Sequence, residues 1–360
     1  MKIAQVAPPW IEVPPKTYGG TETVLHTLVE EQVAQGHDVT LLGPAGSQTS
    51  AKLVPLIEHS LLEEGFSWHD TQIERDYLQR ALEYVYDHTF DIVHTHLSSG
   101  GDMYLFPLLA NAHIPHITTL HSNLPFEPAE VPIDISQEDI ERYTAHVPIV
   151  AISEHACQSQ GLRLNFIGIV HHGISLEKYP MTTDRPNDYF MWLGRFVPEK
   201  GPHLAIQASK QAQVPLMLVG TISQGYEQYY KDTVEPCTHK KQITNYGPAS
   251  YEEKLTLMGF ARGFLNPITW EEPFGMVMIE AMATGCPVIS FARGAAPEII
   301  ADGETGFLVN SLEEMVQAMG RIDEIEREKV RGYVQEHFSC SAMARKYTDI
   351  YQKAIRQFLP

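Results

Sequence analysis

The chain has 360 residues, and 43% of them are hydrophobic, so it can form two domains of ordinary size that each bury a core. Its formal net charge of −19 at pH 7 argues against nucleic acid or an anionic membrane as the main partner. Four scattered cysteines indicate neither a disulfide framework nor a metal cage: Cys157, Cys237, Cys286 and Cys340.

Membrane and export signals are absent from the sequence as given. No apolar stretch reaches the length of a membrane span, and no signal peptide precedes the first expected strand. We therefore expect a soluble protein in the cytoplasm.

The N-terminal segment predicts a strand, a glycine loop and a helix. Residues 2–7 form a short apolar run, which is followed by a proline-rich loop and by Gly19 and Gly20. Apolar residues at helical spacing then predict a helix with Thr21 as its N-cap and Gly36 at its end. Glycine lets the backbone approach a ligand, so we expect Gly19 and Gly20 to face a phosphate. The glycine patterns of a dinucleotide fingerprint and of a P-loop are both missing.

Two further apolar strands, at 90–96 and 114–121, end in histidines. Ligands bind at the carboxyl edge of open α/β sheets, so His96 and His121 are candidates for a site. A zinc site is the rival explanation, but the chain has no His-Glu-x-x-His and no paired Cys-x-x-Cys motif. Between the N-terminal unit and these strands, residues 72–86 predict an amphipathic helix whose polar side mixes charges, which favours core packing.

The second half of the chain repeats the alternation of strands and helices. A polar stretch at 180–188 is interpreted as a linker, and residues 341–358 predict a last helix. Strands are expected at 189–193, 216–220, 242–246, 263–266, 288–291 and 306–309. Repeated βα units predict parallel, doubly wound sheets. We place the first domain at 1–178, the second at 179–340 and a C-terminal helix at 341–360.

A cationic loop follows the first strand of the second half. The run Gly194-Arg195-Phe196-Val197-Pro198-Glu199-Lys200-Gly201 sets a guanidinium and an ammonium on one strand-to-helix connection. Fixed cations aimed at a departing diphosphate stabilise the transition state more than the ground state. Arg195 suits bidentate phosphate contact, whereas Lys200 acts as a point charge.

A pair of carboxylates lies further on, around a Pro-Phe-Gly turn. Glu272 and Glu280 are eight positions apart, and a helix is expected to begin at about Gly275. The free N–H groups of Gly275, Met276 and Val277 could hold a phosphate. Glu280 would lie roughly 7 to 8 Å further along the helix. A sugar, a pyrophosphate and a ribose fit this order.

Together these motifs resemble the family 4 (group 1) retaining glycosyltransferases. The resemblance rests on Glu-x7-Glu, on Gly-Arg-x-x-x-x-Lys-Gly and on the N-terminal Pro-Pro-Lys-x-Tyr-Gly-Gly-Thr-Glu stretch. It implies the GT-B fold, in which two Rossmann-like domains enclose a nucleotide-sugar cleft and the last helix returns to the N-terminal domain. The chain departs from the family at His172-Gly173-Ile174-Ser175, where Asn-Gly-Val-Asp is usual.

The resemblance also implies roles for single residues. Glu272 would contact the donor sugar, Glu280 the ribose, and His121 the sugar hydroxyls, while His96 would face the acceptor. The implied catalytic set is His121, Arg195, Lys200 and Glu272. The implied donor and nucleotide site comprises Gly19, Gly20, Arg195, Lys200, Gly220, Gly247, Ala249, Glu272, Phe274, Gly275, Met276, Val277 and Glu280.

The expected function is that of a retaining transferase, which moves a hexose from a nucleoside diphosphate sugar to an acceptor hydroxyl. A UDP-sugar is favoured by its frequency in the family, and the acceptor is a small molecule or a glycan. No cofactor and no metal are expected, because no Asp-x-Asp element follows a strand and the cations can supply the positive charge. The alternatives are a GT-B nucleotide-sugar epimerase, a sugar phosphorylase or a non-catalytic nucleotide-sugar binding protein.

Overall fold

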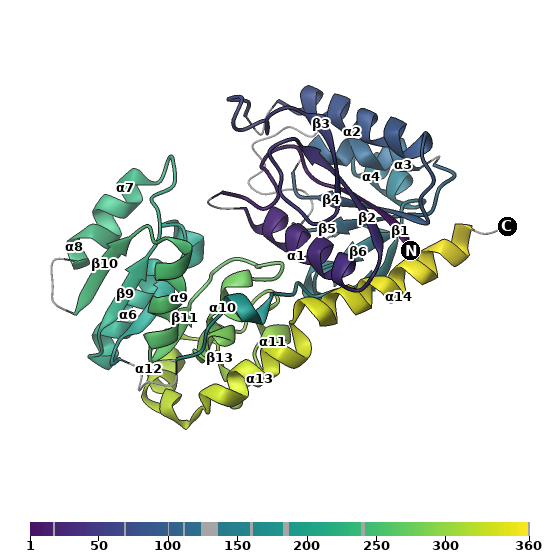
Figure 1. Ribbon diagram of the computed structural model, residues 1–360. Helices are drawn as coiled ribbons and strands as arrows, with labels where there is room; N and C mark the ends of the chain where they lie inside the picture. Colours follow the sequence, from purple (N-terminus) through teal and green to yellow (C-terminus); the bar gives the residue numbers. More distant parts are fainter. Residues whose placement is uncertain are drawn as a thin grey trace. The chain divides into compact units, whose positions relative to one another are not determined.

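The computed structural model describes residues 1–16, 19–67, 70–99, 101–110, 112–123, 136–158, 161–182, 187–238 and 242–358. Tyr18 of the N-terminal motif and residues 183–186 of the expected linker lie outside these ranges. The chain forms two compact units, one of residues 1–173 with 340–360 and one of residues 174–339 (Figure 1). Each unit contains one parallel sheet with helices, so the predicted α/β class with doubly wound sheets is confirmed.

The sheet of the first unit has seven strands in the order β3-β2-β1-β4-β5-β6-β7, and every pairing is parallel. Their bounds are β1 Lys2–Val6, β2 Asp38–Pro44, β3 Lys52–Ile57, β4 Ile92–Leu97, β5 His116–Leu120, β6 Ile149–Ala151 and β7 Phe166–Ile169. The side chains of β4 and β5 are buried along their whole length, as in a sheet that is covered on both faces. Their carboxyl ends carry His96 and His121.

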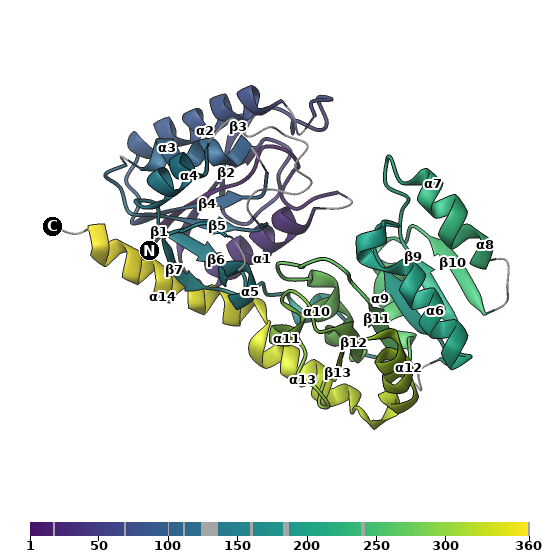
Figure 2. The same cartoon turned by 180° about the vertical axis from the view of Figure 1, so that it is seen from behind.

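Helices cover both faces of this sheet. Figures 1 and 2 show α1 (Gly20–Ala34) and α14 (Cys340–Phe358) on one face, and α2 (Thr71–Tyr86), α3 (Leu105–Leu109) and α4 (Gln137–Thr144) on the other. A short helix, α5 (Glu154–Gln158), follows β6, and η1 (Gly101–Tyr104) precedes α3. The predicted core side of α2 is confirmed, because these residues are buried: Tyr77, Leu78, Ala81, Leu82 and Val85.

The predicted N-cap of α1 is wrong by two residues. The helix begins at Gly20, Gly19 is its N-cap, and Thr21 already lies inside the first turn. The carbonyl oxygen of Gly19 accepts hydrogen bonds from the backbone N–H of Thr23 at 3.1 Å and from the Thr23 hydroxyl at 2.6 Å. These bonds start the helix earlier than the side-chain preference of threonine for the cap position would place it.

The second unit has a six-stranded parallel sheet in the order β10-β9-β8-β11-β12-β13. All six predicted strands are found, as β8 Phe190–Leu193, β9 Leu216–Val219, β10 Ile243–Gly247, β11 Gly263–Asn266, β12 Val288–Phe291 and β13 Gly306–Val309. Helix α6 (Pro202–Ala212) packs on α12 (Leu312–Arg321), whereas α10 (Met276–Ala283) packs on α9 (Tyr251–Phe260) and α13 (Arg327–His337). The shorter helical segments are η2 Leu176–Lys178, η3 Pro198–Lys200, α7 Glu227–Tyr229, η4 Tyr230–Val234, α8 Glu235–Thr238, α11 Ala296–Ile299 and η5 Ile322–Glu324.

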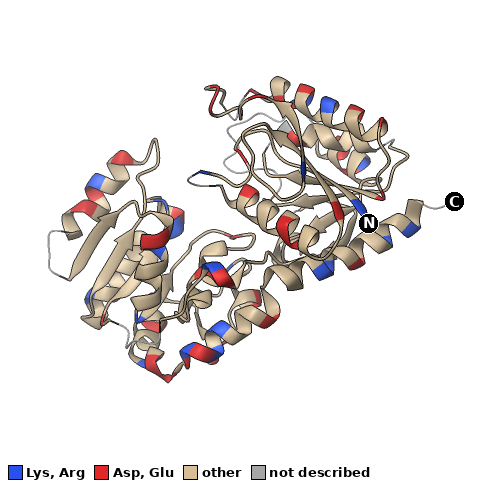
Figure 3. Ribbon diagram, in the orientation of Figure 1, with Lys and Arg blue, Asp and Glu red and all other residues tan. Residues whose placement is uncertain are grey.

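Charged residues lie mainly on helices and loops and hardly at all on the strands (Figure 3). This distribution fits sheets that are buried between layers of helices. No helix within the described ranges is both long enough and apolar enough to cross a membrane.

Candidate active site

The cationic loop lies between β8 and α6, and its lysine is already paired. The ammonium of Lys200 forms an ion pair with Oε2 of Glu272 and lies 4.7 Å above the ring of Trp270. Both partners of this pair are largely buried, with side-chain exposures of 23% and 15%. The structure therefore brings together two predicted site residues that are 72 positions apart in the sequence.

Tight backbone packing holds Lys200 in place. Gly201 follows it with a φ of 67°, and a Cβ there would collide with the carbonyl oxygen of Pro267. Only glycine allows both this conformation and this approach. The indole N–H of Trp192 also donates a hydrogen bond of 2.9 Å to the carbonyl oxygen of Lys200. The loop is thus fixed against β8 and against the residue that follows β11.

Arg195, the second cation of this loop, is exposed. Within the described ranges no side chain pairs with its guanidinium, so its N–H donors can bind a ligand. Lys200 and Arg195 therefore differ, since one is neutralised by a carboxylate and the other is available.

Glu272 is positioned by a segment that sequence analysis did not single out. Its carbonyl oxygen accepts a hydrogen bond of 2.9 Å from the N–H of Ala295, and a Cβ on Gly294 would collide with its backbone. The neighbouring Glu271 accepts a hydrogen bond of 3.0 Å from the N–H of Gly294 and lies 3.5 Å from Arg293. Glu271 is therefore used to anchor the turn, and Glu272 is the carboxylate that faces Lys200. The signal for this segment was an Arg-Gly pair one residue beyond the end of β12, at the carboxyl edge of the sheet.

Helix α10 begins at the predicted place. Gly275 is its N-cap with a φ of 95°, and no side chain caps the helix, so the N–H groups of Met276 and Val277 have no partner within it. A Cβ on Gly275 would lie 3.4 Å from Cγ of Glu272, which places this carboxylate beside the helix N-terminus. Phe274 is buried and its ring lies 6.1 Å from that of Phe338, so it offers a ligand its backbone and not its ring.

Glu280 lies in the second turn of α10 and has partners of its own. Its Oε1 accepts hydrogen bonds from Lys254 at 2.7 Å and from the hydroxyl of Tyr179 at 3.1 Å. Burial, together with the charge of Glu280, raises the pKa of Tyr179, so its hydroxyl keeps its proton and donates. Within the described ranges Oε2 has no partner and can accept a hydrogen bond from a ligand. Tyr179 and Lys254 were missed by sequence analysis, because they lie far from Glu280 in the chain and form no motif with it.

Glycines gather at the carboxyl ends of three neighbouring strands. Gly194, Gly220 and Gly247 follow or end β8, β9 and β10, and the N–H of Gly220 donates to the carbonyl oxygen of Gly247 at 2.9 Å. A Cβ on Gly220 would collide with the carbonyl oxygen of Gly194. Ala249 lies just beyond, before the capping box of Ser250 and Glu253 that starts α9. The backbone is thus close-packed at Gly220, one of the residues of the implied donor and nucleotide site.

The remaining predicted residues lie in the first unit. Nδ1 of His96 lies 2.9 Å from Nε2 of His121, and the His121 ring stacks on His172 at a centroid distance of 5.1 Å. Burial lowers the pKa of His96 and His121 well below the usual value, and it lowers the pKa of His172 to about 3, so the three rings are neutral at pH 7. Gly19 and Gly20 lie at the N-terminus of α1 and form no hydrogen bond with these rings in the described part of the chain. Among the described residues, no group of three or more His, Cys, Asp or Glu side chains is arranged so that it could hold a metal ion.

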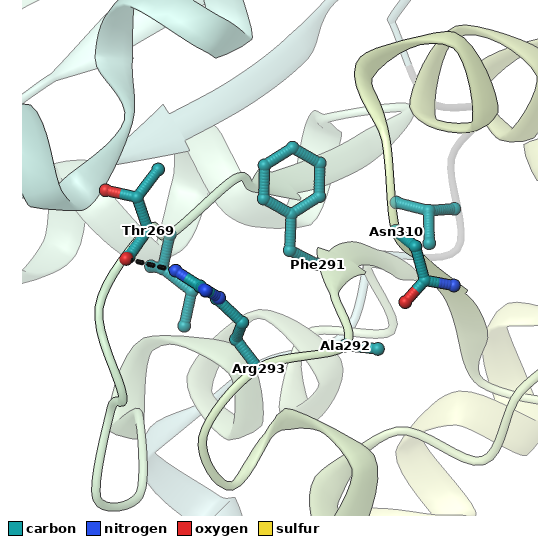
Figure 4. A pocket seen from close by; sticks show the side chains of 7 residues that line it. Thr269, Phe291, Ala292, Arg293 and Asn310 are labelled. Atoms are coloured by element: carbon teal, nitrogen blue, oxygen red, sulfur yellow. Dashed lines mark hydrogen bonds between the residues drawn. The ribbon is translucent and has the colours of Figure 1, made fainter.

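A hollow of about 350 Å³ lies beside the Glu271 turn, at the carboxyl ends of β11, β12 and β13. Figure 4 shows Arg293 reaching to the carbonyl oxygen of Thr269, with Phe291 and Asn310 on the other side of the hollow. Through Arg293 this hollow adjoins the turn that carries Glu272.

Comparison with known proteins covers nearly the whole chain. Residues 18–178 match the family described as Glycosyltransferase Family 4, and residues 181–347 match Glycosyl transferases group 1. Phosphatidyl-myo-inositol mannosyltransferase of Mycolicibacterium smegmatis is 24% identical over 359 residues, 93% of this chain and 87% of that protein. Spore coat protein SA of Bacillus subtilis is 25% identical over 189 residues, and this match spans 45% of the chain and about half, 48%, of that protein.

Solved structures agree on the fold. Sucrose-phosphate synthase from Thermosynechococcus elongatus superimposes with a TM-score of 0.77 over 99% of both chains, at 20% sequence identity. Anabaena HepE in complex with UDP and glucose gives a TM-score of 0.71 over 98% of this chain and 99% of that chain, at 18% identity.

Proposed function

This chain belongs to the group 1 glycosyltransferases of family 4 and has the GT-B fold, and we propose that it is a retaining hexosyltransferase that uses a nucleoside diphosphate sugar. The observation that carries the proposal is the Lys200–Glu272 ion pair beside the uncapped N-terminus of α10. A cation, a carboxylate and free N–H groups at one point suit a sugar joined to a diphosphate.

In the proposed reaction the diphosphate of the donor lies on the N–H groups of Met276 and Val277. Its β-phosphate takes Lys200 away from Glu272, and the exposed Arg195 provides a second, bidentate contact. Glu272 is then free to accept hydrogen bonds from the sugar hydroxyls, and Oε2 of Glu280 accepts those of the ribose. Binding of the donor thus replaces one ion pair by several new contacts.

Retention is proposed to follow from reaction on a single face of the sugar. The bond between C1 and the diphosphate oxygen breaks, and a bond between C1 and the acceptor oxygen forms on the same face. The acceptor's proton passes to the departing phosphate, so no protein base is required. Lys200, Arg195 and the α10 N-terminus stabilise the negative charge that accumulates on the leaving group.

We propose uridine diphosphate as the carrier, because HepE is seen with UDP and glucose and has a similar fold. We also propose that no metal ion takes part, since the loop cations and the helix N-terminus can supply the positive charge. The sugar is proposed to be a hexose and the acceptor a small molecule or a glycan.

A test of this proposal combines binding with product analysis. A thermal-shift panel of uridine, guanosine and adenosine diphosphates and their hexoses should identify the base, because a ligand at about 100 times its Kd adds roughly 2.7 kcal/mol of stability. The best donor should then transfer its hexose in EDTA, and NMR coupling constants of the product should show the donor's anomeric configuration. Turnover that stops in EDTA and returns with manganese would overturn the metal-free proposal.

The same experiment separates the alternatives. Incubation of the donor alone reveals an epimerase through a changed sugar, and added inorganic phosphate reveals a phosphorylase through a sugar phosphate. A protein that binds the nucleotide but consumes no donor with any acceptor would be a binding protein. The two cations of one loop, Lys200 and Arg195, argue against that last function, since a pure binder does not need to stabilise a leaving group.

A further inference from the structure

A buried network of polar side chains surrounds His121 in the first unit. Four histidines take part, His94 and His96 from β4, His121 after β5 and His172 after β7, and all four are buried. The ring centroids of successive members are 4.2 Å, 5.2 Å and 5.1 Å apart. Since each neutral imidazole has one N–H donor and one bare acceptor, the partners of one ring determine the protonation of the next.

The direction of this network is set at Gln5. The Nε2 group of Gln5 donates to Oε1 of Gln32 at 2.9 Å and to the hydroxyl of Tyr351 at 3.1 Å, which leaves its Oε1 facing Nε2 of His96 at 2.9 Å. An amide oxygen only accepts, so Nε2 of His96 carries the hydrogen and its Nδ1 is bare. That bare Nδ1 lies 2.9 Å from Nε2 of His121, which must therefore carry a hydrogen too.

A second branch runs through Tyr351 and agrees with the first. The hydroxyl of Tyr351 accepts from both glutamine amides, from Gln32 at 2.9 Å, so it donates its own hydrogen to Nδ1 of His94 at 2.8 Å. Nε2 of His94 then donates to the hydroxyl of Thr119 at 2.7 Å, and Thr119 donates to Tyr347 at 2.9 Å. With neutral rings, every hydrogen bond in both branches has one donor and one acceptor.

We propose that this network holds His121 as its Nε2–H tautomer and presents Nδ1 as a bare acceptor, with Gln5 and His96 as positioning residues. The contact at that acceptor is the longest of the network, because Nε2 of His172 lies 3.4 Å away, at the limit of hydrogen-bonding range. It is the contact that a ligand displaces most easily. Whatever takes its place must donate a hydrogen bond.

This inference rests on the proposed function and on the contact with the donor-sugar hydroxyls that the family resemblance implies for His121. It restricts the class of donor sugar. A hydroxyl can donate to Nδ1, whereas the carboxylate of a uronic acid cannot and would place its charge against a lone pair. The site therefore selects a sugar with a hydroxyl at that place. The kcat/KM for a UDP-uronic acid should be roughly a hundredfold or more below that for the UDP-hexose of the same configuration.

Histidine ¹⁵N NMR on the intact protein tests the tautomer without any substrate. Long-range ¹H–¹⁵N correlations at pH 7.5 should show a protonated Nε2 and a bare Nδ1 for His121. The ring signals are assigned with variants that each replace one histidine. A protonated Nδ1 would overturn the proposal, because that tautomer requires the side-chain amides of Gln5 and Gln32 both to be flipped. An average of the two tautomers would overturn it as well, because the network would then not fix one form.

Two variants and a matched control separate positioning from simple packing. Gln5→Leu removes the acceptor of His96 and should lose the single tautomer of His121, whereas Gln5→Glu keeps an acceptor and should retain it. Thr119→Val breaks only the His94 branch and should leave the His121 signals unchanged. If Gln5→Leu and Thr119→Val changed the His121 ¹⁵N signals equally, the proposed control of the His121 tautomer by Gln5 and His96 would be contradicted. If His121 is the Nε2–H tautomer but the protein has no transferase activity, only the proposed function is wrong. If the protein is an active transferase but His121 is the other tautomer, only the proposed role of Gln5 and His96 is wrong.

Discussion

Two lysine–glutamate pairs in the second unit resemble each other in setting but differ in expected role. Lys200 pairs with Glu272 and Lys254 pairs with Glu280, and the lysine side chains are 23% and 18% exposed. Partly buried pairs of this kind are costly to break from one side, because the remaining charge loses its partner. Replacing either lysine should therefore destabilise the protein to a similar extent. A difference in activity between the two variants then reflects the role of each lysine in the reaction.

Lys200→Ala is expected to lower turnover by roughly 2 to 4 kcal/mol in barrier, the range for removal of a preorganised group that stabilises developing charge. Lys254→Ala serves as the matched control. It removes a partner of Glu280, whose proposed contact with the ribose is equally strong in the ground and transition states, so it should chiefly raise the donor KM. Steady-state rates and calorimetric titration with nucleoside diphosphate measure both effects. If Lys254→Ala lowered kcat as much as Lys200→Ala, the assignment of Lys200 to the leaving group would be wrong.

At the scale of elements, the spacing of apolar residues and the positions of glycine and proline predicted most of the fold. The six strands of the second unit and the start of α10 were found within one or two residues of their predicted bounds. Most of these strands are short apolar runs closed by glycine, proline or a polar residue. The N-cap of α1 was misplaced, because a threonine two residues beyond a glycine also suits the cap position.

The partners of the proposed site residues could not be predicted in the same way. Gly294 supports the backbone of Glu272, and Tyr179 and Lys254 hold Glu280, yet each lies on a different element and shares no sequence motif with its glutamate. The sequence also predicted Lys200 as a cation for a phosphate, whereas the structure pairs it with Glu272. Such contacts depend on how strands and loops meet in space, which a single sequence does not specify.

Gly201 joins η3 to α6, and its replacement tests how far this connection positions Lys200. In Gly201→Ala the new methyl group meets the Pro267 carbonyl oxygen in a left-handed conformation, so the loop must move and turnover should fall. Gly303→Ala is the matched control, because Gly303 has a φ of 77° and open space around its Cα. Conformational strain alone should cost that control about 1 to 2 kcal/mol of unfolding free energy. Urea titrations that gave equal losses, with normal rates for both variants, would contradict a positioning role for this connection.

The whole molecule is assembled from a chain that passes between the units twice, after residue 173 and after residue 339. The last segment, α14, completes the first unit, where Tyr347 and Tyr351 are buried among the polar side chains of β4, β5 and α1. The interior of this unit contains both buried histidines and buried carboxyls. Both groups couple its stability to pH, but with opposite signs.

Glu22 is the clearest of the buried carboxyls. Burial, reinforced by the charge of Asp102, raises its pKa from 4.5 to about 7. Between these values the folded state keeps a proton that the unfolded state has lost. The contribution of Glu22 to stability is therefore complete below about pH 4.5, falls as the pH rises, and is lost above about pH 7. The buried His172 acts in the opposite direction, since its lowered pKa of about 3 removes stability as the pH falls below 6.5.

The variant Glu22→Gln isolates the contribution of this carboxyl to the pH dependence of stability. It retains the buried histidines, and the glutamine at position 22 is uncharged at every pH. We expect the variant to gain stability over the original protein as the pH rises from 5 to 8, by at most about 3 kcal/mol for a shift of this size. Chemical unfolding followed through tryptophan fluorescence, in parallel with the variant Glu313→Gln on the surface of α12, measures the difference at each pH. The exposed control should show no such trend. A difference that stayed constant from pH 5 to 8, or that grew toward acid, would mean that Glu22 is charged in the folded protein throughout this range and that another contact stabilises its carboxylate.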